Sequence, residues 1–317
     1  MNKERRLFIN QMSFMAGMAA LSKPMASTAA ISKGINTLYS KGQDVTIYHT
    51  NDLHGNLDPV IGNMGGFNQV KTLLKSQDTN GLLLDAGDFL NGKHTTAMQR
   101  QVISMMNNMG YHAATIGDHE LAHGQDHLAA LIPSMRFTLV NCNYEFDGVL
   151  SKLVKPYVII NSGKYRIGIT GVGHRLNGVK YNDPIKSVNT IASLLKENEK
   201  CDLVICLSHL GYSRADAQPD NRLLAKESEQ IDMIISGHGR SLFCDPVIVT
   251  NKRKQEVIIS HTAWDGLMMG KTIFSFGKSR QKSNIKSNYL IPGQPYGQNF
   301  AASFSKLRSM EKQLKSA

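Results

Sequence analysis

Five short apolar segments of this 317-residue chain are each followed directly by Asp or His side chains. The first segment, residues 45–49, precedes Asp52 and His54, and their i, i+2 spacing turns both side chains toward the same side. The other four segments deliver similar groups: Asp88 after 82–85, Asp118 and His119 after 113–116, His209 after 203–207, and His238 after 233–235. Carboxylates and imidazoles that converge in this way predict a site for divalent metal ions.

Such a site would suit the hydrolysis of a phosphoester. Two divalent cations roughly 3.5–4 Å apart can clamp a phosphate, ionise a water and offset charge on the leaving oxygen. Mixed carboxylate and imidazole ligands suit Mn, Zn or Fe and do not choose between them. The residue types therefore predict a cofactor of one or two divalent ions.

The elements that position these residues alternate along the chain. Apolar runs of strand length are separated by helical patterns, which predicts an α/β architecture with buried sheet. The further strands are expected at 137–140, 158–160 and 167–171, and the helices at 67–75, 95–109, 127–131, 188–199 and 221–229. No long helix separates 257–261 from 272–276, so these two segments are expected to be antiparallel strands.

The ordered motifs resemble those of the calcineurin-like dinuclear metallophosphoesterases, specifically the 5'-nucleotidase branch. The resemblance covers residues 45–276 and is carried by the sequences around His49–Gly55, Gly65–Phe67, Asp85–Asp88 and Gly110–Glu120. It implies a two-layer β-sandwich flanked by helices, with the α/β/β/α arrangement, in a single domain. It also implies two divalent metals at the strand ends and a nucleotide or other small phosphoester as substrate.

The same resemblance implies a role for each site residue. Asp52 and His54 would hold the first metal, and Asp88 would bridge both. The second metal would be held by Asp118, His209 and His238. His119 would meet the substrate phosphate and stabilise its transition state, so His119 and Asp88 are the expected catalytic residues. Arg240 and Arg175 are the expected substrate-binding residues, and His174 beside Arg175 is expected to be solvated.

Three positions depart from the family pattern. Asp118 stands in place of an asparagine, and Ala122 in place of an aspartate that orients the catalytic histidine. Arg240 occupies the position of a ligating His or Gln, and a guanidinium cannot ligate a metal. We expect Arg240 to weaken the first metal and Asp118 to tighten the second. The alternatives are that Arg240 grips the substrate phosphate or points to solvent.

The formal net charge of +11 is concentrated at the two ends of the chain. Residues 1–30 carry +3 and residues 278–317 carry +7, which leaves +1 for residues 31–277. A nearly neutral body with basic ends argues against a nucleic acid polymer as a partner. No run of 18 apolar residues exists, which excludes a polytopic membrane protein.

The domain organisation follows from the same segments. Residues 1–30, with Arg5-Arg6-Leu-Phe-Ile, resemble a twin-arginine signal peptide, which predicts a periplasmic protein with no transmembrane segment after cleavage. Residues 31–277 are expected to form the metallophosphoesterase domain, and 278–317 a basic linker and C-terminal helix. Larger family members carry a second, nucleotide-binding domain. A separate chain is expected to supply any substrate-specificity module here, with the cationic helix 301–315 either docked on a partner or solvated.

The leading interpretation is an exported, metal-dependent hydrolase of nucleotides or other small phosphoesters. One alternative is hydrolysis of a sulfur-linked anionic ester, which relatives of this branch also perform. The other is a non-catalytic metal- or ligand-binding subunit, which the departures at Ala122 and Arg240 favour.

Overall fold

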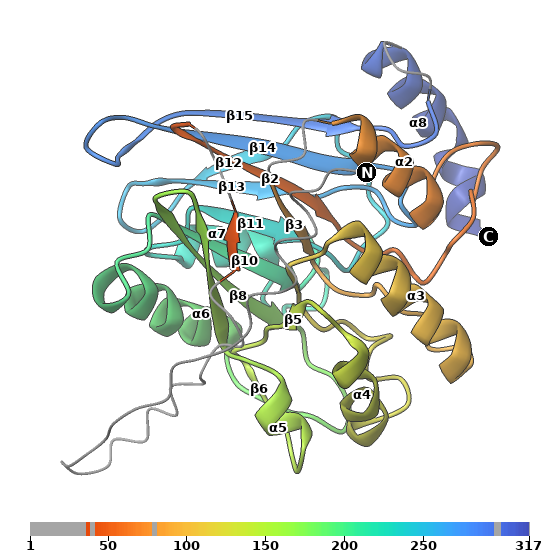
Figure 1. Ribbon diagram of the computed structural model, residues 1–317, viewed down its shortest axis with the longest axis horizontal. Coiled ribbons are helices and arrows are strands. Elements are labelled where there is room, and N and C mark those ends of the chain that lie inside the picture. Colours follow the sequence, from red (N-terminus) through yellow and green to blue (C-terminus); the bar gives the residue numbers. More distant parts are fainter. Residues whose placement is uncertain (1–35, 39–41, 78–80, 295–298, 317) are drawn as a thin grey trace.

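The computed structural model describes residues 36–38, 42–77, 81–294 and 299–316, so the predicted signal peptide lies outside the described part. Two β-sheets share one apolar interior, and helices cover their outer faces (Figure 1). This arrangement confirms the predicted α/β/β/α sandwich. In the described ranges, no helix is both long and apolar enough to cross a membrane.

The six-stranded sheet carries the first three of the polar segments. Its order is β15 (Lys282–Leu290), β14 (Met269–Phe276), β2 (Asp44–Thr50), β3 (Gly81–Asp85), β4 (Ala113–Ala114) and β5 (Thr138–Leu139). Strands β2 to β5 run parallel, and β14 is antiparallel to both its neighbours. The elements beside it are α2 (Gly66–Ser76), α3 (Thr96–Met109), α4 (Gln125–Leu131), the 3-10 turn Ile132–Ser134 and α5 (Leu150–Leu153).

The seven-stranded sheet carries the other two polar segments, those with His209 and His238. Its order is β1 (Asn36–Leu38), β7 (Tyr157–Ser162), β8 (Tyr165–Gly173), β10 (Leu203–His209), β11 (Met233–Ser236), β13 (Glu256–Ser260) and β12 (Val247–Thr250). Its helices are α6 (Pro184–Ser193), which continues as a π-helix over Leu194–Asn198, and α7 (Asn221–Glu227). A small separate pair is formed by β6 (Tyr144–Glu145) and β9 (Lys180–Tyr181).

Apolar side chains from both sheets meet in the middle of the sandwich. Ile47 and Leu84 of one sheet and Ile205 and Ile235 of the other belong to one buried cluster. Each aliphatic side chain buried there stabilises the fold by roughly 1.5–3 kcal/mol. The parallel strands are also covered on their outer faces, so they occur in the sequence as nearly continuous apolar runs. The two layers hold the ends of these strands at fixed positions relative to one another.

Several predicted elements differ from those observed. β4 and β5 each have two residues rather than four, and the helix predicted at 188–199 begins at Pro184, where Asp183 accepts hydrogen bonds from two backbone amides. The segments 257–261 and 272–276 lie in different sheets, as β13 and β14. Each has an antiparallel partner, but they do not pair with one another.

The prediction of a linker after Gly277 is wrong, because residues 282–290 form β15 at the edge of the six-stranded sheet. The strand was missed because its side chains are mostly polar, and only Tyr289 among them is buried. The predicted C-terminal helix is present as α8 (Phe300–Ser316), and its Phe304 and Leu307 join a buried cluster with Trp264. The apolar side of α8 is therefore occupied by the same chain.

Replacing Asp232, just before β11, should destabilise this fold. Its buried carboxylate accepts the backbone N–H of Val204 and pairs with Lys196 (2.7 Å) and Lys282. Burial alone would raise the pKa of Asp232, but the two ammonium groups outweigh it and lower the pKa. A carboxyl group with a lowered folded-state pKa stabilises the fold above its unfolded pKa, near 4, and loses that contribution as the pH falls.

We therefore expect Asp232→Asn to reduce the free energy of unfolding by about 3 kcal/mol at neutral pH, because two ammonium groups lose their partner. Urea unfolding as a function of pH measures this, and the difference from wild type should shrink below about pH 4. Asp147→Asn, which removes an exposed carboxylate, should leave the unfolding midpoint unchanged. A difference for Asp232→Asn that persists unchanged in acid would contradict the ion-pair explanation.

Candidate metal centre

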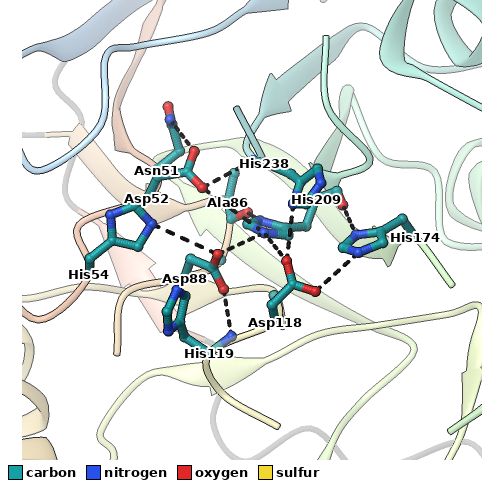
Figure 2. Close-up of polar contacts among 12 residues, drawn as sticks. Asn51, Asp52, His54, Ala86, Asp88, Asp118, His119, His174, His209 and His238 are labelled. Carbon is teal, nitrogen blue, oxygen red and sulfur yellow. Dashed lines mark hydrogen bonds and ion pairs between the residues drawn. The ribbon is translucent and has the colours of Figure 1, made fainter. Parts of the chain in front are cut away.

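The polar residues that follow the strands of both sheets meet at one end of the sandwich (Figure 2). Asp52 and His54 follow β2, Asp88 follows β3, and Asp118 and His119 follow β4; His174 follows β8, His209 ends β10 and His238 follows β11. All eight contribute to three groups of possible metal ligands, and the ligand atoms within each group lie within 4.8 Å of one another. The structure thus brings together all the residues predicted as metal ligands.

The backbone beneath these side chains is strained. Asp52, His54, Asp88 and His238 have φ angles between 48° and 61°, in the left-handed region that residues other than glycine rarely adopt. Such conformations cost of order 1–3 kcal/mol each and persist where the surrounding structure fixes them, most often at functional sites. Here the Gly87 carbonyl accepts the N–H of Asp52, and the Asp88 carbonyl accepts that of His54. The two loops therefore fix one another.

Asp88 lies at the centre of the cluster. Its Oδ2 is 3.2 Å from His209 Nε2 and 3.9 Å from His54 Nε2, and its Oδ1 accepts the backbone N–H of His119 at 2.8 Å. Burial alone would raise the pKa of Asp88, but the facing His209 outweighs it and the pKa is lowered to about 2. The buried Glu120 accepts backbone N–H bonds from Asp88 and from Gly117, so the loops after β3 and β4 are joined beneath the site.

His209 is almost fully buried and has the geometry of a metal ligand. Its Nδ1 lies 2.7 Å from the carbonyl oxygen of Ala86. Since a carbonyl can only accept, Nδ1 donates a proton to it, and Nε2 is the ring nitrogen left to bind a cation. Burial alone would lower the pKa of His209, but the facing Asp88 carboxylate raises it well above its usual value, so a cation that binds Nε2 would displace a proton from it. This Nε2 has no hydrogen-bond partner of suitable geometry among the described residues, and it lies 4.0 Å from Asp52 and from Asp118. A buried imidazole nitrogen that faces three carboxylates fits a divalent cation.

Asp118 is held between two imidazoles. Its Oδ1 is 3.0 Å from His174 Nε2, and its Oδ2 is 3.1 Å from His238 Nδ1. Burial would raise the pKa of Asp118, but these two hydrogen bonds hold it well below its usual range. His174 is buried, contrary to the expectation that it is solvated. Sequence reasoning missed it, although it follows a strand directly, as the predicted ligands do.

Besides Asp88 at its Nε2, His54 contacts a carboxylate at its Nδ1, and sequence reasoning missed this partner too. Asp265, in the loop between β13 and β14, lies 2.7 Å from His54 Nδ1 and accepts a hydrogen bond from Asn56. Burial favours the neutral form of His54, but this carboxylate raises its pKa. Because Asp265 holds Nδ1, the Nε2 atom of His54 is directed toward the cluster. Such a carboxylate orients a ligating imidazole and increases its basicity.

Asp265→Asn should therefore weaken metal binding at the His54 side of the cluster by roughly tenfold, at the low end of the effect of removing such a partner. Asparagine tolerates the left-handed backbone of Asp265 (φ 55°) and keeps an acceptor for His54, so the change removes mainly charge. Calorimetric titration of metal-free protein measures the affinity. Asp58→Asn removes an exposed carboxylate and serves as control. Equal affinities in Asp265→Asn and wild type would show that Asp265 does not support the ligand.

His119 has a backbone partner in place of the aspartate that Ala122 replaces. Its Nδ1 accepts the N–H of Gly92 at 2.9 Å, so the proton of the neutral ring lies on Nε2. A Cβ at Gly92 would lie 2.5 Å from that of Ala122, so the small side chains let the two segments approach. Burial lowers the pKa of His119, which favours this neutral ring with one N–H to donate.

The two predicted substrate-binding arginines do not join the cluster. Arg240 is exposed and has no hydrogen-bond or ion-pair partner in the described part of the chain, and Arg175 is exposed with its guanidinium 5.1 Å from the ring of Tyr181. The side chain of a third arginine, Arg214, and that of His238 both lie close to Gly211. Asp216 holds its Nε and Nη2, while Nη1 lacks a partner among the described residues.

The chain matches known phosphoesterases. Residues 45–239 match the sequence profile of the family described as calcineurin-like phosphoesterase. A trifunctional nucleotide phosphoesterase of Bacillus subtilis is 26% identical over 291 residues, covering 78% of this chain and 19% of the relative. A 5'-nucleotidase of Rattus norvegicus is 27% identical over 294 residues, covering 80% of this chain and 49% of the relative.

Among solved structures, the 5'-nucleotidase precursor from Thermus thermophilus superposes with a TM-score of 0.70 at 22% identity, covering 86% of this chain and 59% of that one. This similarity supports the fold. The chain spans half or less of the length of the two curated relatives from Bacillus subtilis and Rattus norvegicus.

Proposed function

Because this chain belongs to the calcineurin-like phosphoesterase family, we propose that it is a metal-dependent hydrolase of nucleotides or other small phosphoesters. The observation that carries the proposal is the convergence of carboxylates and imidazoles around Asp88, at the ends of strands from both sheets. The family uses divalent metal ions, and the residues present fit them: His209 Nε2 is a buried ring nitrogen that faces the carboxylates of Asp88, Asp52 and Asp118.

The assignment of the ligands follows the family resemblance, and the central position of Asp88 supports it. Asp52, His54 and Asp88 would hold one cation, and Asp88, Asp118, His209 and His238 the other. When bound, the cations supply positive charge to the phosphate oxygens and acidify water. The identity of the metal, Mn, Zn or Fe, is left open by this mixed donor set.

The distribution of burial supports one direction of approach for the substrate. Asp52, Asp88 and His209 are buried at the base of the site, whereas the side chains of Asp118 and His238 remain 37% and 34% exposed. A phosphate group from solvent would therefore approach over Asp118, His119 and His238. In this position the Nε2–H of His119 can donate to a phosphoryl oxygen, where it stabilises charge that develops during transfer.

We further propose that Arg214 is the guanidinium nearest to the approaching substrate. Asp216 fixes its orientation, its Nη1 is a buried donor without a partner in the described structure, and the nearby Asp118 carboxylate helps to raise its pKa. Arg240 and Arg175 remain candidates for contacts with the outer part of a substrate, since both are exposed. The twin-arginine signal that we propose for residues 1–30 would place this activity in the periplasm. The charged side of α8, with Lys306 and Arg308, remains available to a separate chain that carries a specificity module.

A substrate panel tests the proposal. The purified protein, supplied in turn with Mn, Zn and Fe, is incubated with an aryl phosphate, nucleoside monophosphates and a sulfur-linked anionic ester. We expect phosphate release from the aryl phosphate and from at least one nucleotide. Turnover of the sulfur-linked ester alone would favour the alternative hydrolase, and metal binding without any turnover would favour a binding subunit.

A further inference from the structure

We infer that His174 is a direct ligand of the second cation, which makes that site rich in imidazole and selective for Zn or Fe over Mn. This inference rests on the proposed two-metal centre and adds a residue that the family resemblance does not assign. His174 immediately follows β8 and is 8% exposed, so its imidazole is fixed within the protein rather than mobile in solvent.

The hydrogen bonds of His174 match those of a ligating histidine. Its Nδ1 lies 3.0 Å from the carbonyl oxygen of His209 and must donate to it, which leaves Nε2 for the cluster. His209 has the same arrangement, with Nδ1 on the carbonyl of Ala86. A ligating histidine is oriented in this way, by donating its other ring N–H to a carboxylate or a backbone carbonyl.

The distances also fit ligands of a single ion. With bonds of about 2.0–2.2 Å, neighbouring ligand atoms in tetrahedral or octahedral geometry lie about 2.9–3.5 Å apart. His174 Nε2 is 3.0 Å from Asp118 Oδ1, and His238 Nδ1 is 3.1 Å from Asp118 Oδ2. The rings of His174 and His238 lie side by side, with centroids 4.1 Å apart, and all three residues form one group of convergent ligand atoms (Figure 2).

The two cation sites then differ in chemistry. In the ligand assignment proposed above, the first site has Asp52, Asp88 and the imidazole of His54. The second has Asp88, Asp118 and the imidazoles of His174, His238 and His209, whose Nε2 lies 4.0 Å from Asp118 and also 4.0 Å from Asp52. Imidazole suits Zn and Fe, carboxylate suits Mn, and Zn exceeds Mn in intrinsic affinity for nitrogen donors. His174 and Asp118 therefore act together to separate the two sites by metal preference.

Competitive metal titrations of the full-length protein test this inference without measuring turnover. Affinities for Zn and for Mn at the tighter site are measured by calorimetry in wild type, His174→Asn and His174→Gln, with the exposed His123→Asn as control. Loss of a ligand should lower Zn affinity by about 100-fold or more and Mn affinity much less. His174 would instead be only a charged partner of Asp118 if both affinities fell by the same factor or stayed unchanged.

X-ray absorption at the Zn edge gives a second readout on wild-type protein loaded with one equivalent of Zn. Three imidazoles in the coordination shell are expected, and two would overturn the inference. Failure of the proposed function would look different, because it would abolish turnover in wild type without altering the Zn-to-Mn ratio or the number of imidazoles.

Discussion

Asp88→Asn should cause the largest loss of activity of any single ligand substitution. We expect kcat/KM for an aryl phosphate to fall on the order of 10³–10⁴-fold, which is about 4–5.5 kcal/mol of transition-state stabilisation. The reason is positional: Asp88 lies between His54 and His209, so its carboxylate would serve both cations. Asn keeps the size of the side chain and one acceptor for the His119 amide, so the change isolates the lost charge.

Steady-state kinetics together with metal analysis of the purified variant measures the effect. The variant should contain less metal than wild type after dialysis, because both sites lose a charged ligand. Asp147→Asn, which removes an exposed carboxylate away from the cluster, should match wild type in both measurements. If Asp88→Asn retained full metal content and near-normal kcat/KM, a bridging role for Asp88 would be ruled out.

His119→Ala should produce a large loss of a different kind. We expect kcat to fall on the order of 10²–10³-fold while the metal content stays at the wild-type value, because the Nε2–H would act on the substrate rather than on a cation. The half-buried ring is held at Nδ1 by the Gly92 amide, so removing it frees one backbone donor at the edge of the site. His123→Ala, an exposed neighbour, is the matched control.

The metal content of His119→Ala separates two roles for this residue. His119 also lies within reach of His54 and Asp88 as a possible ligand. Loss of one metal from the variant would therefore make His119 a ligand of the first cation. An unchanged kcat with unchanged metal content would remove His119 from the reaction altogether.

The metal cluster was largely predictable because its residues follow apolar strands. Parallel strands of one sheet end at the same edge, so Asp52, Asp88 and Asp118 had to lie near one another once β2, β3 and β4 were recognised. His209 and His238 join them because the second sheet presents the ends of β10 and β11 to the same place. The sandwich was predictable for the same reason, since its buried strands are apolar on both faces.

What escaped prediction depended on contacts between distant segments. Asp265 meets His54 across 211 residues of sequence, and no local pattern marks that pairing. His174 does follow a strand, but its place on the loop after that strand, next to Arg175, led to the expectation that it is solvated. The partner of His119 is a backbone N–H of Gly92, which has no side-chain signature at all. β15 was missed because an exposed edge strand needs few apolar residues.

The central claim is that the strand-end cluster binds two divalent cations and that phosphoester hydrolysis depends on them. The most direct test is to titrate metal-free wild-type protein with divalent metal while recording bound metal per chain and phosphate release from an aryl phosphate. We expect no turnover in the metal-free protein, turnover that appears as two ions bind, and loss of that turnover on chelation. Undiminished turnover after complete removal of metal, or a folded protein with two bound ions and no turnover on any phosphoester, would contradict the claim.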